Sequence, residues 1–362
     1  MNCINGIGRG CVVAVVLAGL IGYAASGVAE EQAADRAPSP AAATPAELVW
    51  PSPPLAPRIR YVASLSTPAD IGYEKGFWRK VWDFIRGEDE TEQVLRPMAV
   101  TTDSRERVLI ADTRSRRIHI FDRLNKEYSF IAQAGDETFL LPIGLAVDGR
   151  DQIYVADGER NKVYVFQPDG KFDHVLKGTD DFVRPASIAI DRTRQRLYVI
   201  DVPRHQVKVI DLATEQEVAT IGNRGDGLGD FNFPSYVSLD RTGHLAVTDT
   251  MNMRIQLFDP EGKPLLSFGK QGDGSGDFTA PKGVALDSEG HIYVADGGFD
   301  NVQIFGRDGK LRLYWGSMGQ QPGQFWLPTG LYIDERDRIY VADSHNGRIQ
   351  IFQYLGGGDE KK

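Results

Sequence analysis

The stretch from residue 281 to residue 315 decides the fold, because it holds four short strand-like segments in a row. They read Pro281-Lys-Gly-Val-Ala-Leu-Asp287, Ile292-Tyr-Val-Ala-Asp296, Val302-Gln-Ile-Phe305 and Leu311-Arg-Leu-Tyr-Trp315. Apolar residues alternate within the segments, and Asp, Gly or a polar loop bounds them, which is the pattern of β-strands. Four strands within about 40–50 residues are typical of one blade of a β-propeller.

The same pattern occurs six times along the chain. Each copy opens on a proline, and these prolines are Pro97, Pro142, Pro185, Pro234, Pro281 and Pro328. Neighbouring prolines lie between 43 (Pro142 to Pro185) and 49 (Pro185 to Pro234) residues apart. A linear array of repeats needs capping units, whereas a ring closes on itself. We therefore predict an all-β, six-bladed β-propeller with four-stranded antiparallel blades, spanning residues 58–355.

The two ends of the repeated region indicate how the ring closes. The segment Arg58-Ile-Arg-Tyr-Val-Ala-Ser-Leu65 precedes the first repeat and resembles a fourth strand. The last repeat ends near Tyr354 with only its first three strands. We expect the N-terminal strand to complete the sixth blade.

Two kinds of residue recur once per repeat and are predicted to be structural. An aspartate ends each second strand, where its carboxylate can accept backbone N–H groups of the next turn; the six are Asp112, Asp157, Asp201, Asp249, Asp296 and Asp343. A large apolar residue stands three positions before each opening proline and is expected to wedge between blades; the six are Val94, Phe139, Phe182, Phe231, Phe278 and Phe325.

Two blocks resemble the NHL repeat: Asp249-Thr-Met-Asn-Met-Arg-Ile-Gln-Leu-Phe258 and Asp343-Ser-His-Asn-Gly-Arg-Ile-Gln-Ile-Phe352. That family carries an Asn-x-Arg element after a Val-Ala-Asp strand. The resemblance supports the propeller but not one function, since propellers carry many functions. The whole chain also resembles bacterial exported NHL proteins found alongside multihaem c-type cytochromes, which implies a c-type cytochrome as a partner.

The first 29 residues are predicted to be an export signal. Arg9 supplies a positive charge, Cys11 to Ala25 form a short apolar run, and Gly27 and Ala29 are small residues before a cleavage site. A cleaved signal is favoured over an uncleaved membrane anchor, so the protein is expected in the periplasm or outside the cell. Residues 30–57 are rich in Ala and Pro and are predicted to be a linker, and residues 356–362 a flexible tail.

Composition limits the classes of partner. The chain has 362 residues and a formal net charge of −9, which argues against nucleic-acid binding. Both cysteines lie within the first 29 residues, so a mature chain would have no disulfide and no thiolate site. Three glycine-rich connections begin at Gly222, Gly269 and Gly316 and are interpreted as turns rather than as phosphate or calcium sites. A monomeric propeller is expected.

The candidate binding face is the one where the connections between blades and the loops after the second strands emerge. Residues at non-equivalent positions in these loops are candidates for function: Arg114, Arg160, Arg204, Met253, Phe299 and His345. The residues after the opening prolines are expected around the mouth of the central channel: Met98, Ile143, Ala186, Ser235, Lys282 and Thr329. Lys282 is the charged member of this second set and is also a candidate.

One connection departs from the repeat. Between Leu65 and Pro97, a predicted helix at residues 76–87 carries an apolar stripe with two tryptophans. Its apolar residues are Phe77, Trp78, Val81, Trp82, Phe84 and Ile85. Three interpretations remain open: a clasp packed on the propeller, a helix that docks a protein partner, or a helix at a membrane surface.

No catalytic constellation is visible in the sequence. The six histidines fall in turns, variable loops or outer strands, and none lies on a first strand, where a channel metal would be bound. We expect no cofactor and no metal, and we interpret the chain as a non-catalytic exported scaffold for protein interaction. The alternative is a metal-dependent propeller enzyme of the lyase or lactonase type.

Overall fold

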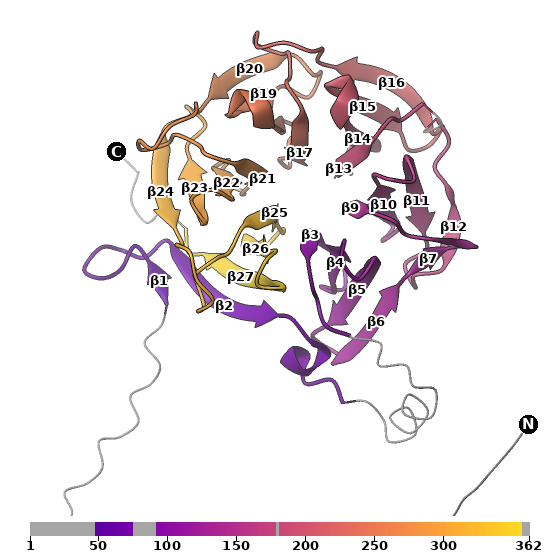
Figure 1. Ribbon diagram of the computed structural model, residues 1–362, viewed down its shortest axis with the longest axis horizontal. Helices are drawn as coiled ribbons and strands as arrows, with labels where there is room; N and C mark the ends of the chain where they lie inside the picture. The colour runs from indigo at the N-terminus through magenta and orange to yellow at the C-terminus, as the bar shows by residue number, and fades with distance from the viewer. Residues whose placement is uncertain (1–47, 75–91, 179–180, 357–362) are drawn as a thin grey trace, which may run out of the picture. The chain divides into compact units, whose positions relative to one another are not determined.

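Six antiparallel sheets follow one another around a central axis (Figure 1). The computed structural model describes residues 48–74, 92–178 and 181–356, and all of them belong to one unit. The predicted signal at 1–29 and the predicted helix at 76–87 lie outside the described residues, as does most of the tail.

Blades 1 to 5 each consist of four consecutive strands. Blade 1 is β3 (Pro97–Thr102), β4 (Val108–Asp112), β5 (Arg117–Asp122) and β6 (Glu127–Ile131). Blade 2 is β9 (Pro142–Val147), β10 (Ile153–Asp157), β11 (Lys162–Phe166) and β12 (Phe172–Val175). Blade 3 is β13 (Pro185–Asp191), β14 (Arg196–Asp201), β15 (Gln206–Asp211) and β16 (Gln216–Ile221).

Blade 4 is β17 (Pro234–Leu239), β18 (Leu245–Asp249), β19 (Arg254–Phe258) and β20 (Pro264–Phe268). Blade 5 is β21 (Pro281–Leu286), β22 (Ile292–Asp296), β23 (Asn301–Phe305) and β24 (Leu311–Trp315). Short elements join them: the hairpin β7 (Gln133–Ala134) and β8 (Glu137–Thr138), and the 3₁₀ turns η1 (Pro68–Ile71), η2 (Val202–Arg204) and η3 (Thr250–Asn252).

The sixth blade joins the two ends of the propeller. It contains β25 (Pro328–Ile333), β26 (Arg338–Asp343) and β27 (Arg348–Tyr354) from the last repeat. Strand β2 (Ile59–Leu65) pairs antiparallel with β27, with Ile59 opposite Tyr354 and Leu65 opposite Ile349. The predicted all-β, six-bladed fold and its closure by the N-terminal strand are therefore confirmed.

The sixth blade also has a fifth strand. Strand β1 (Val49–Trp50) pairs with β2 on the outside of this sheet. The ring of Trp50 packs edge-on against Phe352, with 5.8 Å between centroids. Part of the segment assigned to the linker at 30–57 is thus paired with the propeller.

The core lies between blades rather than within them. Because each blade packs against two neighbours, its second strand is buried almost end to end, as in β22. The predicted wedge residues lie in the six inter-blade clusters and are confirmed as core: Val94, Phe139, Phe182, Phe231, Phe278 and Phe325.

In two of the glycine-rich connections, the position of the wedge phenylalanine explains why the chain has a glycine. Gly222 and Gly269 have φ values of 85° and 87°, a region that residues with a β-carbon avoid. A β-carbon at Gly222 would lie 2.2 Å from the ring of Phe231, and one at Gly269 would lie 2.2 Å from Phe278. The glycines therefore make room for the wedge phenylalanines.

A pair of substitutions on β2 tests the closure of the ring. Ile59 is fully buried against blade 5 and β27, whereas Val62 on the same strand is 41% exposed. We expect Ile59→Ala to lower the free energy of unfolding by about 2–4 kcal/mol and Val62→Ala to lower it by less than about 0.5 kcal/mol. Urea unfolding followed by circular dichroism measures both. Equal effects would contradict the pairing of β2 with β27 as a core contact.

Candidate functional site

One buried aspartate per blade organises the face of the propeller where the blade connections emerge. The six have no exposed surface: Asp112, Asp157, Asp201, Asp249, Asp296 and Asp343. In blade 2, Asp157 accepts the N–H groups of Leu140 and Leu141, the two residues before Pro142, at 2.8 and 3.0 Å. The same carboxylate accepts the N–H group of Arg160 in the turn after β10. Each such aspartate therefore ties the incoming connection to the outgoing loop.

In blade 1 a histidine joins this arrangement. Asp112 accepts the N–H groups of Leu95 and Arg96 at 2.6 and 3.1 Å, and its Oδ2 lies 3.4 Å from Nε2 of the fully buried His119. Burial raises the pKa of Asp112, but hydrogen bonds from His119 and from the N–H groups of Leu95 and Ser115 outweigh it. The pKa falls from 3.8 to about 2.

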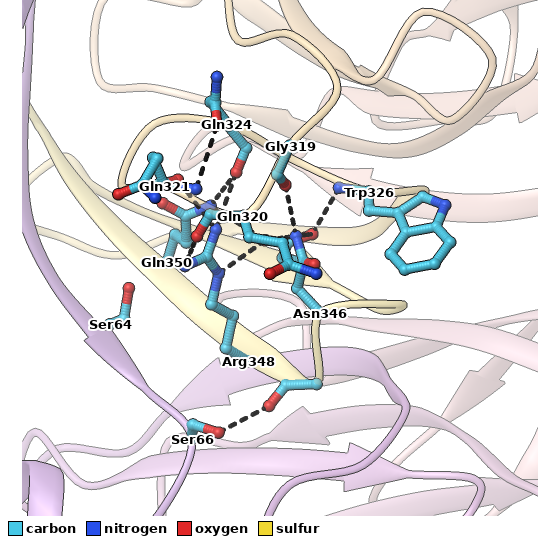
Figure 2. A network of polar contacts seen from close by, with 12 residues as sticks. Ser64, Ser66, Gly319, Gln320, Gln321, Gln324, Trp326, Asn346, Arg348 and Gln350 are labelled. Atoms are coloured by element: carbon cyan, nitrogen blue, oxygen red, sulfur yellow. Dashed lines mark hydrogen bonds and ion pairs between the residues drawn. The ribbon is translucent and has the colours of Figure 1, made fainter.

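Blade 6 adds an arginine to the aspartate (Figure 2). Arg348 Nε lies 2.7 Å from Oδ2 of Asp343, and the rest of its guanidinium donates to the backbone of the preceding connection. The acceptors are the carbonyl groups of Gln320, Gln321 and Gln324, at 2.7, 3.0 and 3.0 Å. One side chain thus holds three carbonyl groups of the loop between blades 5 and 6.

Two amides complete the arrangement in blade 6. Gln350 donates to the carbonyl group of Gln324 at 2.6 Å and accepts the N–H group of Gly323 at 2.8 Å. Asn346 donates to the carbonyl group of Gly319 at 2.8 Å. We call Asn346, Arg348, Gln350 and Asp343 the blade-6 clamp.

Blade 4 has the same clamp. Arg254 lies 2.7 Å from Asp249 and donates to the carbonyl groups of Asp226 and Gly227 at 2.7 and 2.8 Å. Gln256 donates to the carbonyl group of Asp230 at 2.7 Å. Arg254 and Arg348 each leave 13% of the side chain exposed, so both are committed to the fold rather than available to a ligand.

A pocket of about 340 Å³ opens at the mouth of the central channel on this face. It is lined by all six residues that follow the opening prolines: Met98, Ile143, Ala186, Ser235, Lys282 and Thr329. Arg96 and Arg184, which directly precede Pro97 and Pro185, also line it. The backbones of both arginines are fixed, because their N–H groups donate to Asp112 and Asp201 at 3.1 and 3.0 Å.

An ion pair crosses the other end of the channel. Arg192 of blade 3 lies 3.1 Å from Glu335 of blade 6, on the opposite side of the ring. Arg241 of blade 4 donates to the carbonyl group of Glu335 at 2.6 Å. These residues line a second pocket of about 320 Å³, so the two ends of the channel differ in chemistry.

Two family models match parts of the chain. Residues 278–306 and 325–352 match the NHL repeat, and residues 100–222 match a family described as "6-bladed beta-propeller". The chain is an NHL-repeat six-bladed β-propeller. No curated protein matches the sequence significantly.

Solved structures similar to this NHL propeller have varied functions. A virginiamycin B lyase from Staphylococcus aureus has a TM-score of 0.53 and 13% identity, covering 73% of this chain and 97% of that one. A gluconolactonase from Xanthomonas campestris has a TM-score of 0.54 and 17% identity, covering 72% and 89%. An auxiliary nutrient binding protein from Bacteroides thetaiotaomicron has a TM-score of 0.58 and 13% identity, covering 74% and 71%. At these identities the likeness establishes the fold alone.

The candidate residues from the variable loops do not line the mouth pocket. Arg160 donates to the carbonyl group of Thr138, and Arg204 pairs with Asp181 and Asp201. The ring of His345 packs beside Trp326. Arg114, Met253 and Phe299 do not line the mouth pocket either; of the seven candidates, Lys282 does.

Sequence reasoning missed Arg96 and Arg184. The signal was present, because both occupy the position before an opening proline and the neighbouring positions after the prolines had been placed at the mouth. The helix candidates Phe77, Trp78, Val81, Trp82, Phe84 and Ile85 lie outside the described residues.

Metal and nucleophile chemistry finds little support on this face. Within 48–74, 92–178 and 181–356, no three His, Cys, Asp or Glu side chains lie close enough together to hold a metal ion. Ser115 Oγ lies 3.2 Å from Nε2 of His119, but His119 is fully buried and its Nδ1 contacts Tyr128 at 2.8 Å. The Ser115–His119 pair is therefore part of the blade-1 packing. In the same ranges, no helix is long and apolar enough to cross a membrane.

Removing the arginine of a clamp should destabilise the fold. Arg348→Met leaves the buried Asp343 without its cation, so we expect the free energy of unfolding to fall by about 3 kcal/mol. Arg312→Met, which removes an exposed pair with Asp308, should cost less than about 1 kcal/mol. Denaturant unfolding of both variants gives the comparison. A loss for Arg348→Met no larger than that for Arg312→Met would show that the clamp is dispensable.

The depressed pKa of Asp112 makes stability depend on pH. The folded-state pKa is about 2 against an ordinary 3.8, so the stabilisation is present above about pH 4 and is lost as the pH falls toward 2. The full effect is about 2 kcal/mol. In Asp112→Asn this component is absent, so the gap in stability between wild type and variant should be constant above about pH 5 and shrink below pH 4. Urea titrations across this range measure the gap; a gap independent of pH would contradict the assignment.

Proposed function

We propose that this NHL propeller is a non-catalytic binding module that works outside the cytoplasm and holds a protein partner on its channel-mouth face. The observation that carries the proposal is a set of large apolar side chains left exposed around the mouth. They are Val183 (45% exposed), Phe233 (43%), Met251 (58%) and Trp326 (40%). We call these four residues the apolar rim.

Phe233 is a costly residue for folding at its position. Its backbone has a φ of 51°, a region that glycine occupies freely and bulky residues avoid. The N–H group of Phe233 donates to Nδ1 of His205 at 3.0 Å, and the two rings lie 4.4 Å apart. The ring nevertheless remains exposed, so its contribution to the core does not explain its presence. A role in binding does.

Trp326 in blade 6 is also an exposed aromatic residue on a backbone that the fold holds in place. Its N–H group donates to Asp343 at 2.8 Å, which fixes the backbone two residues before Pro328. The indole lies beside His345, with 5.3 Å between ring centroids. Aromatic side chains and methionine are enriched at the centres of protein interfaces, and exposed apolar groups that cluster on one face mark such sites.

The proposal also includes export from the cytoplasm. A cytochrome as the partner and an enzymatic function have less support than protein binding. Export rests on the apolar run from Cys11 to Ala25 behind Arg9. A cytochrome partner rests on the sequence resemblance alone, because neither the described residues nor the comparisons add support for it. A lyase or lactonase would need a metal cluster, and the described part of the chain offers none.

Substitution of the rim tests the proposal. We expect Phe233→Ala, Met251→Ala and Trp326→Ala, combined in one chain, to weaken partner binding by at least about tenfold, because interface energy concentrates in such residues. The matched control combines Val218→Ala, Leu265→Ala and Tyr314→Ala, which remove similarly exposed side chains from the fourth strands β16, β20 and β24.

The readout is cross-linking in the cells that produce the protein, followed by mass spectrometry and affinity measurement with the identified partner. The partner should be lost from the rim variant and retained by the control, with both variants folded. An unchanged cross-linking pattern in the rim variant, or equal loss in both, would overturn the proposal.

A further inference from the structure

The charged residues that line the mouth pocket are all cationic. Its lining includes Arg96, Arg184 and Lys282 and no carboxylate among the described residues. These three, which we call the three-cation site, come from blades 1, 3 and 5, so they alternate around the ring. The chain as a whole has a formal net charge of −9, which makes a purely cationic pocket a departure from the average surface.

The charged groups of the three cations have no partner among the described residues. No described side chain or carbonyl group lies within hydrogen-bond or ion-pair distance of the charged groups of Arg96, Arg184 or Lys282. On the same face, by contrast, Arg254 and Arg348 pair with aspartates, and Lys162 lies 2.8 Å from Glu137. The fold thus pairs Arg254, Arg348 and Lys162 within the protein, whereas the three pocket cations remain for another molecule.

The hydroxyl groups of the pocket are already engaged within the protein. Ser235 contacts Thr250, and Thr329 contacts Ser344 at 2.6 Å. Ser187 accepts the N–H group of Val237 at 3.2 Å. The three cations are therefore the main polar groups that the described lining can offer to a ligand, since the remaining walls are largely apolar.

The apolar walls of the pocket require that its ligand also has an apolar part. Met98, Ile143 and Leu327 line the same pocket as the cations. A volume of about 340 Å³ is at the lower end of the range for small-molecule sites, which are mostly apolar with a few placed polar groups. The other end of the channel is crossed by the Arg192–Glu335 pair, so a ligand would enter from the mouth.

The backbone fixes the positions from which the cations project. Asp112 and Asp201 accept the N–H groups of Arg96 and Arg184, and the carbonyl group of Lys282 accepts a hydrogen bond from Thr248 at 2.7 Å. We propose that the mouth pocket binds a small organic polycarboxylate, whose carboxylates meet Arg96, Arg184 and Lys282 and whose body lies against the apolar walls. This site does not depend on the protein partner proposed above.

Isothermal titration calorimetry of the purified protein with benzene-1,3,5-tricarboxylate tests this inference. This probe has three carboxylates on an apolar ring. We expect a dissociation constant below about 1 mM, weakening as ionic strength rises because the attraction is electrostatic. The neutral triamide of the same ring should not bind.

Variants assign the binding to the three cations. Each of Arg96→Gln, Arg184→Gln and Lys282→Gln should weaken binding of the tricarboxylate several-fold, and the three together by roughly 30-fold or more. The matched control combines Lys171→Gln, Lys263→Gln and Lys310→Gln, which removes three charges from exposed turns between third and fourth strands. It should bind as tightly as wild type.

The outcomes separate this inference from the protein-docking proposal. Absence of tricarboxylate binding to wild type, binding of inorganic phosphate alone, or binding by the triple cation variant within twofold of wild type would overturn the inference. The rim variant should retain tricarboxylate binding, because Phe233, Met251 and Trp326 do not line the pocket. Loss of the protein partner with intact anion binding would concern the docking proposal alone.

Discussion

A fully buried carboxylate is the constraint on which every blade depends. An aspartate at the end of a second strand cannot be desolvated unless its oxygens are saturated with hydrogen bonds. Asp157 meets this condition by taking N–H groups from both the incoming connection and the outgoing turn. The requirement therefore fixes two loops at once. Where an arginine occupies one oxygen, as Arg348 does on Asp343, one N–H group of the connection is displaced, and that of Leu327 turns to Asp300 of the neighbouring blade at 2.7 Å.

Packing between blades converts these local constraints into a closed ring. Each inter-blade cluster receives a wedge residue from the connection that the aspartate holds, so loop and core are fixed together. Phe278, for example, is fully buried beside Phe305, and the connection that carries it is tied to Asp296 through the N–H group of Thr279 at 2.9 Å. Strand β2 gives the sixth blade the strand that its own repeat lacks. A chain without disulfides in its described part can in this way close on apolar burial and strand pairing.

The repeat made the fold predictable from the sequence. It did not predict which residues of the candidate site are used in contacts within the protein. Period-two segments, recurring prolines and the orphan strand at Arg58–Leu65 were enough to predict blades, wedge residues and closure, because each is a local pattern. The contacts that arginines make within the protein could not be predicted in this way. Arg160 and Arg204 stand in variable loops and read as available, yet the fold uses both in contacts with its own backbone or carboxylates. Arg96 and Arg184 read as ordinary residues before proline, although the repeat already places the residues after the same prolines at the mouth. Strand β1 was missed for a similar reason: two residues in a Pro-rich segment carry no periodic signal.

Repetition also explains where functional residues can vary. The aspartates, wedge residues and glycines are held by the ring and cannot change without loss of packing, whereas the positions on either side of each opening proline contribute mainly to the mouth. These positions hold cations in blades 1, 3 and 5 and apolar or hydroxyl side chains in the others. The apolar rim draws on the same connections, with Val183 directly before Arg184 and Trp326 directly before Leu327. Because the aspartates fix the backbone beneath both sets, an exposed aromatic and an unpaired cation can be presented without either having to order its own loop. Binding usually costs conformational entropy because side chains and loops become ordered, and here the fold has already ordered them. This favours the channel mouth over the outer strands as the place where this propeller binds.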